Sequence, residues 1–130
     1  MTNRQVDIPL FPLNIFLLPG EQLPLHIFEP RYQQLFNEAK AGQTFGLPFT
    51  SQKADKTLVS ECKLLKVVKE YEAGESDVVI ECLSISELVE FKNTFPGKLY
   101  PGGTINTAFE VSFTEDVSEE LVELFQEYIH

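Results

Sequence analysis

The segment IPLFPLNIFLLPGEQLPLHIFEPRY, residues 8–32, contains most of the local structural signals of this chain and is nearly free of charge. Pro9 and Pro12 exclude a helix and remove two backbone donors. The apolar residues up to Leu18 are therefore predicted to form an extended strand of the kind found at sheet edges. A Pro-Gly pair then turns the chain.

A second short strand and a helix follow this turn. Leu23–Phe28 is a short apolar run, and Glu29 and Pro30 open a helix because proline is well tolerated at the first helical position. The helix is expected to extend to Ala41, with Gly42 as its left-handed cap. Its apolar residues recur at spacings of three, four and seven, which predicts one buried face. That face comprises Tyr32, Leu35, Phe36 and Ala39.

The string PLFPLNIFLLPGEQLPLHIFEPRY, residues 9–32, resembles the opening of the N-terminal, substrate-binding domain of Lon protease, especially the form found as a small standalone protein in bacteria. A proline-interrupted strand, a PG turn and then LPLHIFEPRY form a long ordered string, which is more specific than a short glycine motif. The resemblance implies a PUA-like pseudo-barrel of about six antiparallel or mixed strands, with a helix after the second strand. It also implies a role in binding polypeptides.

Composition limits the possible functions. A chain of 130 residues with 43% hydrophobic residues is expected to form one folded domain with a sizeable core. Its formal charge of −10 disfavours binding to nucleic acid and to anionic membranes. No stretch approaches the ~20 apolar residues of a membrane span, and the N-terminus lacks the pattern of a signal peptide, so the protein is expected in the cytoplasm. Cys62 and Cys82 belong to no CxxC or Cys/His cluster, and no metal or cofactor is expected.

The middle of the chain predicts strands. Phe45–Phe49 is a short strand in which Gly46 allows close approach of another backbone. Leu58–Tyr71 and Asp77–Phe91 flank the sequence AGES and are predicted to form a long antiparallel hairpin. If AGES is the turn, the numbers of paired residues sum to about 149 and the two cysteines do not meet. One face of the second strand would then carry Val79, Leu83, Ile85, Val89 and Phe91.

The end of the chain divides into a strand and a helix. Thr104–Phe113 alternates apolar and polar residues and is predicted to be a strand. Residues 116–130 are predicted to form an amphipathic helix, after a barrel domain at residues 1–115. Proteins of the family that this sequence resembles usually continue here into a helical bundle. This helix is therefore interpreted as the start of such a helical region. Its apolar stripe is expected to pack on the barrel, in a monomer or weak dimer, and comprises Leu121, Leu124, Phe125 and Tyr128.

One group of residues superficially resembles a hydrolytic site. His26, Glu29 and Arg31 place an imidazole, a carboxylate and a guanidinium within six residues. No nucleophilic Ser or Cys lies nearby, and Pro30 changes the chain direction inside the group. We therefore interpret them as a structural corner, with Glu29 accepting the first helical amides and Arg31 holding a carboxylate or carbonyl.

Aromatic residues near turns are the candidate binding residues. Phe49, Phe95 and Tyr100 are candidates because partners commonly dock on aromatic anchors. The alternative is that Leu99 and Tyr100 form a short strand with Phe95 tucked under the turn, since aromatic residues are mostly buried.

The sequence contains no GxxxxGK[ST] phosphate loop and no room for the ATPase and peptidase modules of a whole Lon protease. The chain is therefore expected not to be an enzyme. The leading hypothesis is a non-catalytic module that binds unfolded or exposed polypeptide segments through a shallow apolar surface or a sheet edge. The alternatives are an adaptor that docks on a larger protease or chaperone, and a small-molecule binder with a pocket between barrel and helix.

Overall fold

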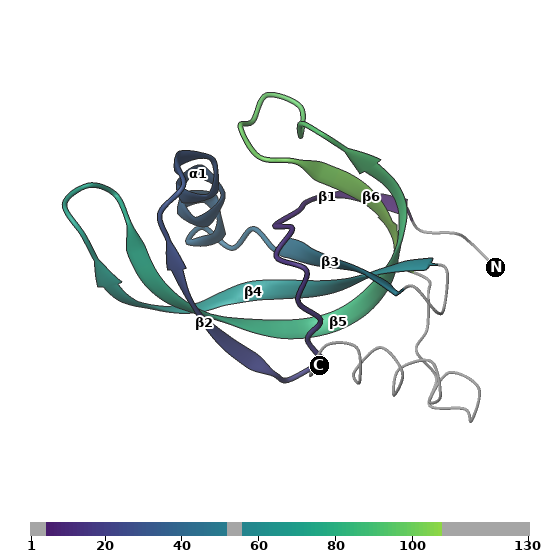
Figure 1. Cartoon of the computed structure of the whole chain (residues 1–130), viewed down its shortest axis with the longest axis horizontal. Helices are drawn as coiled ribbons and strands as arrows, with labels where there is room; N and C mark the ends of the chain where they lie inside the picture. Colours follow the sequence, from purple (N-terminus) through teal and green to yellow (C-terminus); the bar gives the residue numbers. More distant parts are fainter. Residues whose placement is uncertain (1–4, 52–55, 108–130) are drawn as a thin grey trace.

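The computed structural model describes residues 5–51 and 56–107, which form a mostly β structure with one helix (Figure 1). This arrangement confirms the predicted class and the position of the helix after the second strand. The elements are β1 (Gln5–Pro9), β2 (Gln22–Ile27), α1 (Pro30–Ala39), β3 (Phe45–Ser51), β4 (Lys56–Glu70), β5 (Ser76–Lys92) and β6 (Gly102–Asn106). No helix among these residues is long and apolar enough to cross a membrane.

The strands form one antiparallel sheet that curls back on itself. Their order is β1-β6-β5-β4-β3, and β2 pairs with the first part of β5. The two ends of the sheet meet where Leu10, just after β1, forms a parallel bridge with Gly46 of β3. The Phe11 amide also donates to the Gly46 carbonyl at 2.8 Å. This contact confirms that Gly46 is a point of close approach, and it gives the sheet its barrel-like closure.

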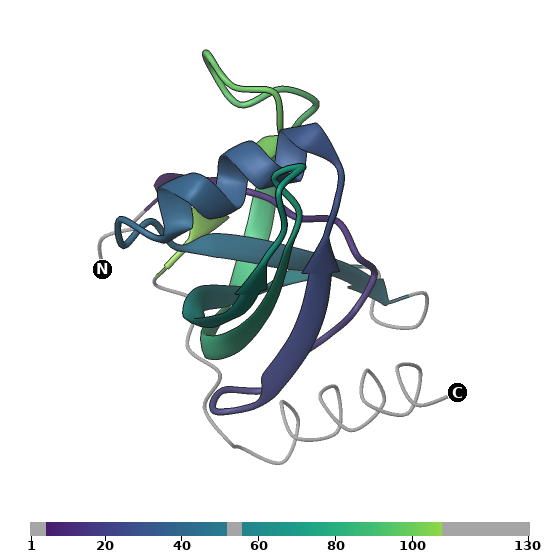
Figure 2. The same ribbon diagram turned by 90° about the vertical axis from the view of Figure 1, so that its left-hand side faces the viewer.

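The helix covers the concave side of the sheet. In Figure 1, α1 lies above the curved ribbon of β4 and β5, and Figure 2 shows it beside the turn that joins these strands. The predicted apolar face of α1 is confirmed, because its four residues are buried in the main core cluster. Aromatic rings connect the helix to the sheet, with the Phe36 and Phe45 ring centroids 5.0 Å apart and those of Tyr32 and Phe11 4.4 Å apart.

Prolines mark the strands that lie at the edges of the sheet. β1 contains Pro9, β2 contains Pro24 and β3 contains Pro48, whereas β4, β5 and β6 contain none. A proline has no backbone N–H to donate, so it is tolerated where a strand is paired on one side only. The distribution of prolines along the sequence therefore follows the topology of the sheet.

The predicted hairpin of β4 and β5 is confirmed, but its predicted register is wrong. Glu70 pairs with Ser76, so the turn is centred on Ala73, and three register shifts follow along the strands. Cys62 consequently lies opposite Cys82, and both thiols are buried and free. Val78, Ile80 and Cys82 of β5 are buried in the core. Of the face predicted for this strand, Ile85 is buried, whereas Leu83, Val89 and Phe91 are exposed.

Two further expectations concern the first strand and the last part of the chain. β1 covers Gln5–Pro9, so the expected extension of the first strand to Leu18 is wrong. The segment between β1 and β2 is irregular, and Asn14 in this segment has a φ of 56°. The start of the predicted strand at Thr104 lies in β6. The rest of that strand and the predicted helix at residues 116–130 lie outside the described residues.

Candidate functional site

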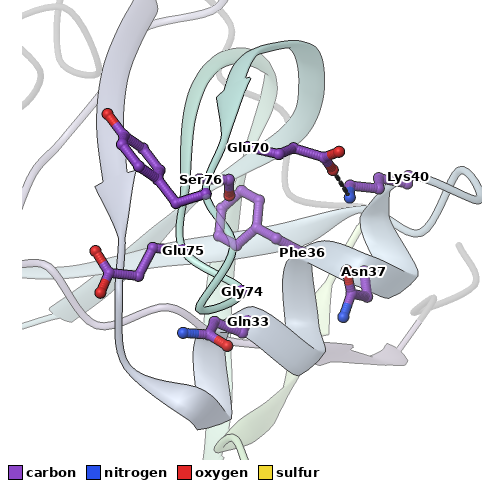
Figure 3. A pocket seen from close by; sticks show the side chains of 9 residues that line it. Gln33, Phe36, Asn37, Lys40, Glu70, Gly74, Glu75 and Ser76 are labelled. Atoms are coloured by element: carbon purple, nitrogen blue, oxygen red, sulfur yellow. Dashed lines mark hydrogen bonds and ion pairs between the residues drawn. The ribbon is translucent and has the colours of Figure 1, made fainter.

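Two pockets lie beside α1. The first, which we call the helix–hairpin pocket, has a volume of about 260 Å³ and lies between α1 and the turn of β4 and β5 (Figure 3). The second, the helix–loop pocket, has a volume of about 560 Å³ and lies between the end of α1 and the loop before β6. The first is lined by Gln33, Phe36, Asn37, Lys40, Glu70, Tyr71, Gly74, Glu75 and Ser76, and the second by Glu38, Ala41, Gly42, Gln43, Phe95, Lys98 and Tyr100.

The helix–hairpin pocket brings together groups from segments far apart in the sequence. The Lys40 ammonium from α1 pairs with the Glu70 carboxylate from β4, as the dashed line in Figure 3 shows. Gln33 approaches the turn so closely that a Cβ atom on Gly74 would lie 2.7 Å from the Gln33 Oε1 atom. Gly74 also has a φ of +93°, a conformation that other residues rarely adopt. A glycine in the turn therefore lets the hairpin close against the helix.

In the helix–loop pocket, the loop before β6 is fastened to α1 through Glu38. The Tyr100 hydroxyl donates to the Glu38 carboxylate, and the Lys98 ammonium donates to it at 2.6 Å. Burial, together with the bond to Glu38, raises the pKa of Tyr100. The Phe95 amide donates to the Tyr100 carbonyl at 2.9 Å, which closes the loop on itself. The loop is thus held in one conformation.

Two adjacent glutamines of α1 bind the backbone of two residues whose apolar side chains are exposed. The Gln33 amide donates to the Phe28 carbonyl at 2.8 Å, and the Gln34 carbonyl accepts from the Leu99 amide at 2.8 Å. The side chains of Phe28 and Leu99 remain 60% and 64% exposed. Large apolar side chains that are exposed on a backbone held in place are suitable contact points for a binding partner.

A cluster of hydrogen-bonded side chains lies next to Phe28. The His26 Nδ1 atom lies 2.7 Å from Asp77, its Nε2 atom lies 2.8 Å from Glu75, and the Tyr71 hydroxyl donates to Asp77 at 2.7 Å. The bonds to Asp77 and Glu75 raise the pKa of His26 above its ordinary value. The bonds from Tyr71 and His26 lower the pKa of Asp77. The cluster therefore joins β2 to the turn of β4 and β5 most strongly when the imidazole is protonated.

This cluster predicts a pH dependence of stability. Because the folded-state pKa of His26 is raised, its contribution is fully present below the unfolded-state value of about 6.5 and is lost as pH rises through the folded-state value. We therefore expect His26→Asn to lower the melting temperature near pH 5.5 and to have little effect above about pH 9. Thermal unfolding followed by circular dichroism across this range would test it; a difference between the two proteins that stays constant with pH would contradict it.

The expected structural corner divides into two parts. Glu29 is the N-cap of α1 through its backbone carbonyl, which accepts from the Tyr32 and Gln33 amides, and its side chain makes no cap hydrogen bond. Arg31 pairs with the exposed Glu29 carboxylate at 3.3 Å and lies over the Tyr32 ring. The expectation of a side-chain cap is therefore wrong, whereas Arg31 does hold a carboxylate, that of Glu29. His26 belongs to the separate cluster described above.

The expected aromatic anchors are mostly internal. Phe49 is 6% exposed and packs on Phe16, and Tyr100 is 1% exposed, so the expectation that they are surface anchors is wrong. Phe95 is half-buried and stacks on Tyr100 at 5.9 Å, which agrees with the alternative of a tucked aromatic. The exposed apolar residue of this loop is Leu99, and the one before α1 is Phe28. The sequence analysis did not select Phe28 or Leu99 as a binding residue. The available signals were the position of Leu99 in a turn that contains proline and the position of Phe28 just before the start of α1.

Comparisons with known proteins agree with the fold. A crystal structure of a Lon N-terminal domain protein from Xanthomonas campestris is similar with a TM-score of 0.65 and 20% identity, over 92% of this chain and 75% of that chain. The N-terminal domain of the Mycobacterium avium complex Lon protease is similar with a TM-score of 0.61 and 12% identity, over 91% of this chain and 63% of that chain. No curated protein sequence matches this chain.

The family of the protein follows from a match that covers nearly the whole sequence. Residues 7–130 match the family described as the ATP-dependent protease La (LON) substrate-binding domain. This match confirms the resemblance seen in residues 9–32 and extends it over almost the whole chain. The protein therefore belongs to the Lon substrate-binding domain family.

Proposed function

We propose that this protein is a non-catalytic module that binds unfolded or exposed polypeptide segments through the surface around α1. Its membership of a substrate-binding domain family supports the general role. The observation that carries the location is the pair Phe28 and Leu99, which α1 holds exposed beside the two pockets. The backbones of these two residues are already held by hydrogen bonds, so this part of the surface loses little backbone entropy when a flexible chain binds.

The binding mode follows from the edges of the sheet. A client could in principle add a strand to an open edge, but Pro24 interrupts the row of donors on β2. The outer part of β4, beyond its pairing with β3 at Cys62, has register shifts at Leu64/Lys66 and Val67/Lys69, which disturb a continuous edge. Recognition through side chains and pockets is therefore favoured over strand addition.

We expect the full chain to bind reduced, carboxymethylated lactalbumin and not native lactalbumin. Lactalbumin is acidic, so binding to a chain of net charge −10 cannot result from charge attraction. Replacing both Phe28 and Leu99 with serine should weaken this binding by about tenfold or more, because exposed apolar anchors carry most of the energy of such contacts. Fluorescence anisotropy of the labelled unfolded protein would measure the affinity.

A matched control is Val89→Ser, which alters an exposed apolar side chain of β5 that lies outside both pockets. The melting temperature should be unchanged in all variants, because the altered side chains face solvent. Failure of the wild-type chain to bind the unfolded protein would contradict the proposed function. Equal affinity of the double variant and the wild type would contradict the proposed surface.

The two alternative functions receive no specific support from the described residues. A small-molecule site would require a closed apolar pocket, whereas both pockets are open to solvent and lined by charged and amide groups. The adaptor hypothesis rested on residues 116–130, which lie outside the described residues. The oligomeric state, expected to be monomer or weak dimer, remains a prediction.

A further inference from the structure

The helix–hairpin pocket contains a buried hydroxyl group that has no partner among the residues that the structure describes. Ser76, the first residue of β5, lines the pocket and is only 7% exposed. Within residues 5–51 and 56–107 its side chain makes no hydrogen bond. The other two buried serines differ in position: Ser60 exchanges two hydrogen bonds with Leu17, and Ser86 lies outside the pocket. A buried hydroxyl without a partner is unfavourable, and a ligand that bonds to it would remove that penalty.

The charges around this pocket favour a cationic ligand. Its walls carry one ammonium group, on Lys40, and two carboxylates, on Glu70 and on Glu75, which also lies 2.8 Å from the His26 Nε2 atom. The remaining polar groups of the lining include the side-chain amides of Gln33 and Asn37, whose oxygens can accept hydrogen bonds. The pocket also lies in a chain of formal charge −10, which attracts cations at long range.

The volume and the lining of the pocket indicate which cationic group would fit. A volume of about 260 Å³ lies below the range of drug-sized sites and suits one long side chain. Phe36 and Tyr71 place two aromatic rings in the lining, and guanidinium groups stack on aromatic faces more readily than ammonium groups do. A guanidinium has five donors in a plane, enough for a carboxylate, a hydroxyl and an amide oxygen together.

We propose that the helix–hairpin pocket receives an arginine side chain of the bound polypeptide, with its guanidinium bonded to the Glu70 carboxylate and the Ser76 hydroxyl. This inference rests on the proposed polypeptide-binding function and assigns it a sequence preference. Lys40 is the internal competitor, because its ammonium occupies Glu70 when the pocket is empty. Such a partly exposed pair contributes little to stability, so a bidentate arginine can replace it at small cost.

The test uses peptides whose central residue is the only difference between them. The probe is an acetylated and amidated nine-residue peptide of Gly, Ser and Leu with arginine at its centre. Its analogues carry citrulline, which has nearly the shape of arginine without the charge, or lysine or leucine. Titration into the full chain, followed by the amide NMR signals of Gly74 and Ser76, should give an affinity at least about fivefold higher for arginine than for citrulline.

Substitutions in the pocket should change this preference in opposite directions. Ser76→Ala and Glu70→Gln are each expected to weaken binding of the arginine peptide by about three- to tenfold. Lys40→Gln is expected to strengthen it, because the Glu70 carboxylate loses its competitor; a purely structural role for the pair predicts no gain. Ser84→Ala, which alters an exposed serine of β5 outside the pocket, is the matched control and should leave the affinity unchanged.

Three outcomes would overturn the inference. Equal affinity for the arginine and citrulline peptides would show that the pocket does not recognise the positive charge of the side chain. A preference for arginine that persists unchanged in Ser76→Ala and Glu70→Gln would place the arginine elsewhere. A weaker affinity in Lys40→Gln would reverse the role given to Lys40. The lactalbumin assay separates these results from failure of the proposed function, since unfolded lactalbumin would still bind in each case.

Discussion

Replacing Tyr100 with alanine is expected to lower the free energy of unfolding by about 3 to 5 kcal/mol, the range for emptying a buried aromatic site. Tyr100 is 1% exposed and is among the largest fully buried side chains of the described residues. Its removal would also take away the ring on which Phe95 stacks and the hydroxyl that donates to Glu38. Urea denaturation followed by circular dichroism would measure the loss.

The control for this substitution is Tyr100→Phe, which keeps the ring and removes only the hydroxyl. A hydrogen bond to a charged group contributes about 1.5 to 3 kcal/mol, so this variant should be clearly more stable than Tyr100→Ala. A loss below about 1 kcal/mol in Tyr100→Ala would mean that the ring is not part of the core.

Introducing valine at Gly46 is expected to destabilise the fold by about 3 kcal/mol or more, at the upper end of the range for overpacking a core. Even the Cβ atom of a new side chain would lie 2.4 Å from the Val59 Cγ1 atom and 3.0 Å from the Leu10 Cδ2 atom. Both neighbours are fully buried and cannot turn toward solvent. The clash would act where the two ends of the sheet meet, so it should loosen the closure as well as the local packing.

A double-mutant cycle distinguishes this clash from a general intolerance of β3. In the background Val59→Ala, the contact at 2.4 Å no longer exists, so Gly46→Ala should cost less there than in the wild type. The coupling should appear as a difference of at least about 0.5 kcal/mol between the two costs, measured by denaturation. Strictly additive costs would show that the glycine is needed for another reason.

The features that depend on local pattern could be predicted from the sequence. The spacing of Tyr32, Leu35, Phe36 and Ala39 identified the buried face of α1, and the hairpin of β4 and β5 followed from two long runs around a glycine. Gly46 was recognised as a point of close approach. In each case neighbouring residues supply the physical cause, either helical periodicity or the conformational freedom of glycine.

The features that depend on register could not be predicted. Each β-bulge shifts the pairing by one residue, and nothing local to the sequence marks where the shifts near Cys62, Leu64 and Val67 occur. The turn centred on Ala73, together with the shifts at Val67/Lys69 and Leu64/Lys66, placed Cys62 opposite Cys82 against expectation.

The candidate site was missed for a similar reason. Gln33 and Lys40 come from α1, whereas Glu70 and Ser76 come from the two ends of the hairpin, and no motif connects them. The glycine of the turn, Gly74, was the one local signal that this hairpin approaches another element closely.

The prolines of β1, β2 and β3 acquire a further meaning in the proposed role. A protein that holds unfolded chains is in repeated contact with segments able to stack into cross-β fibrils, and an uninterrupted edge would seed that growth. Pro9, Pro24 and Pro48 interrupt the hydrogen-bonding edges of β1, β2 and β3. The remaining open part of β4 carries charged lysines at positions 63, 66 and 69, which disfavour pairing with another strand. If the domain has the proposed role, these interrupted edges are expected to keep a bound, aggregation-prone chain from nucleating a fibril on its surface.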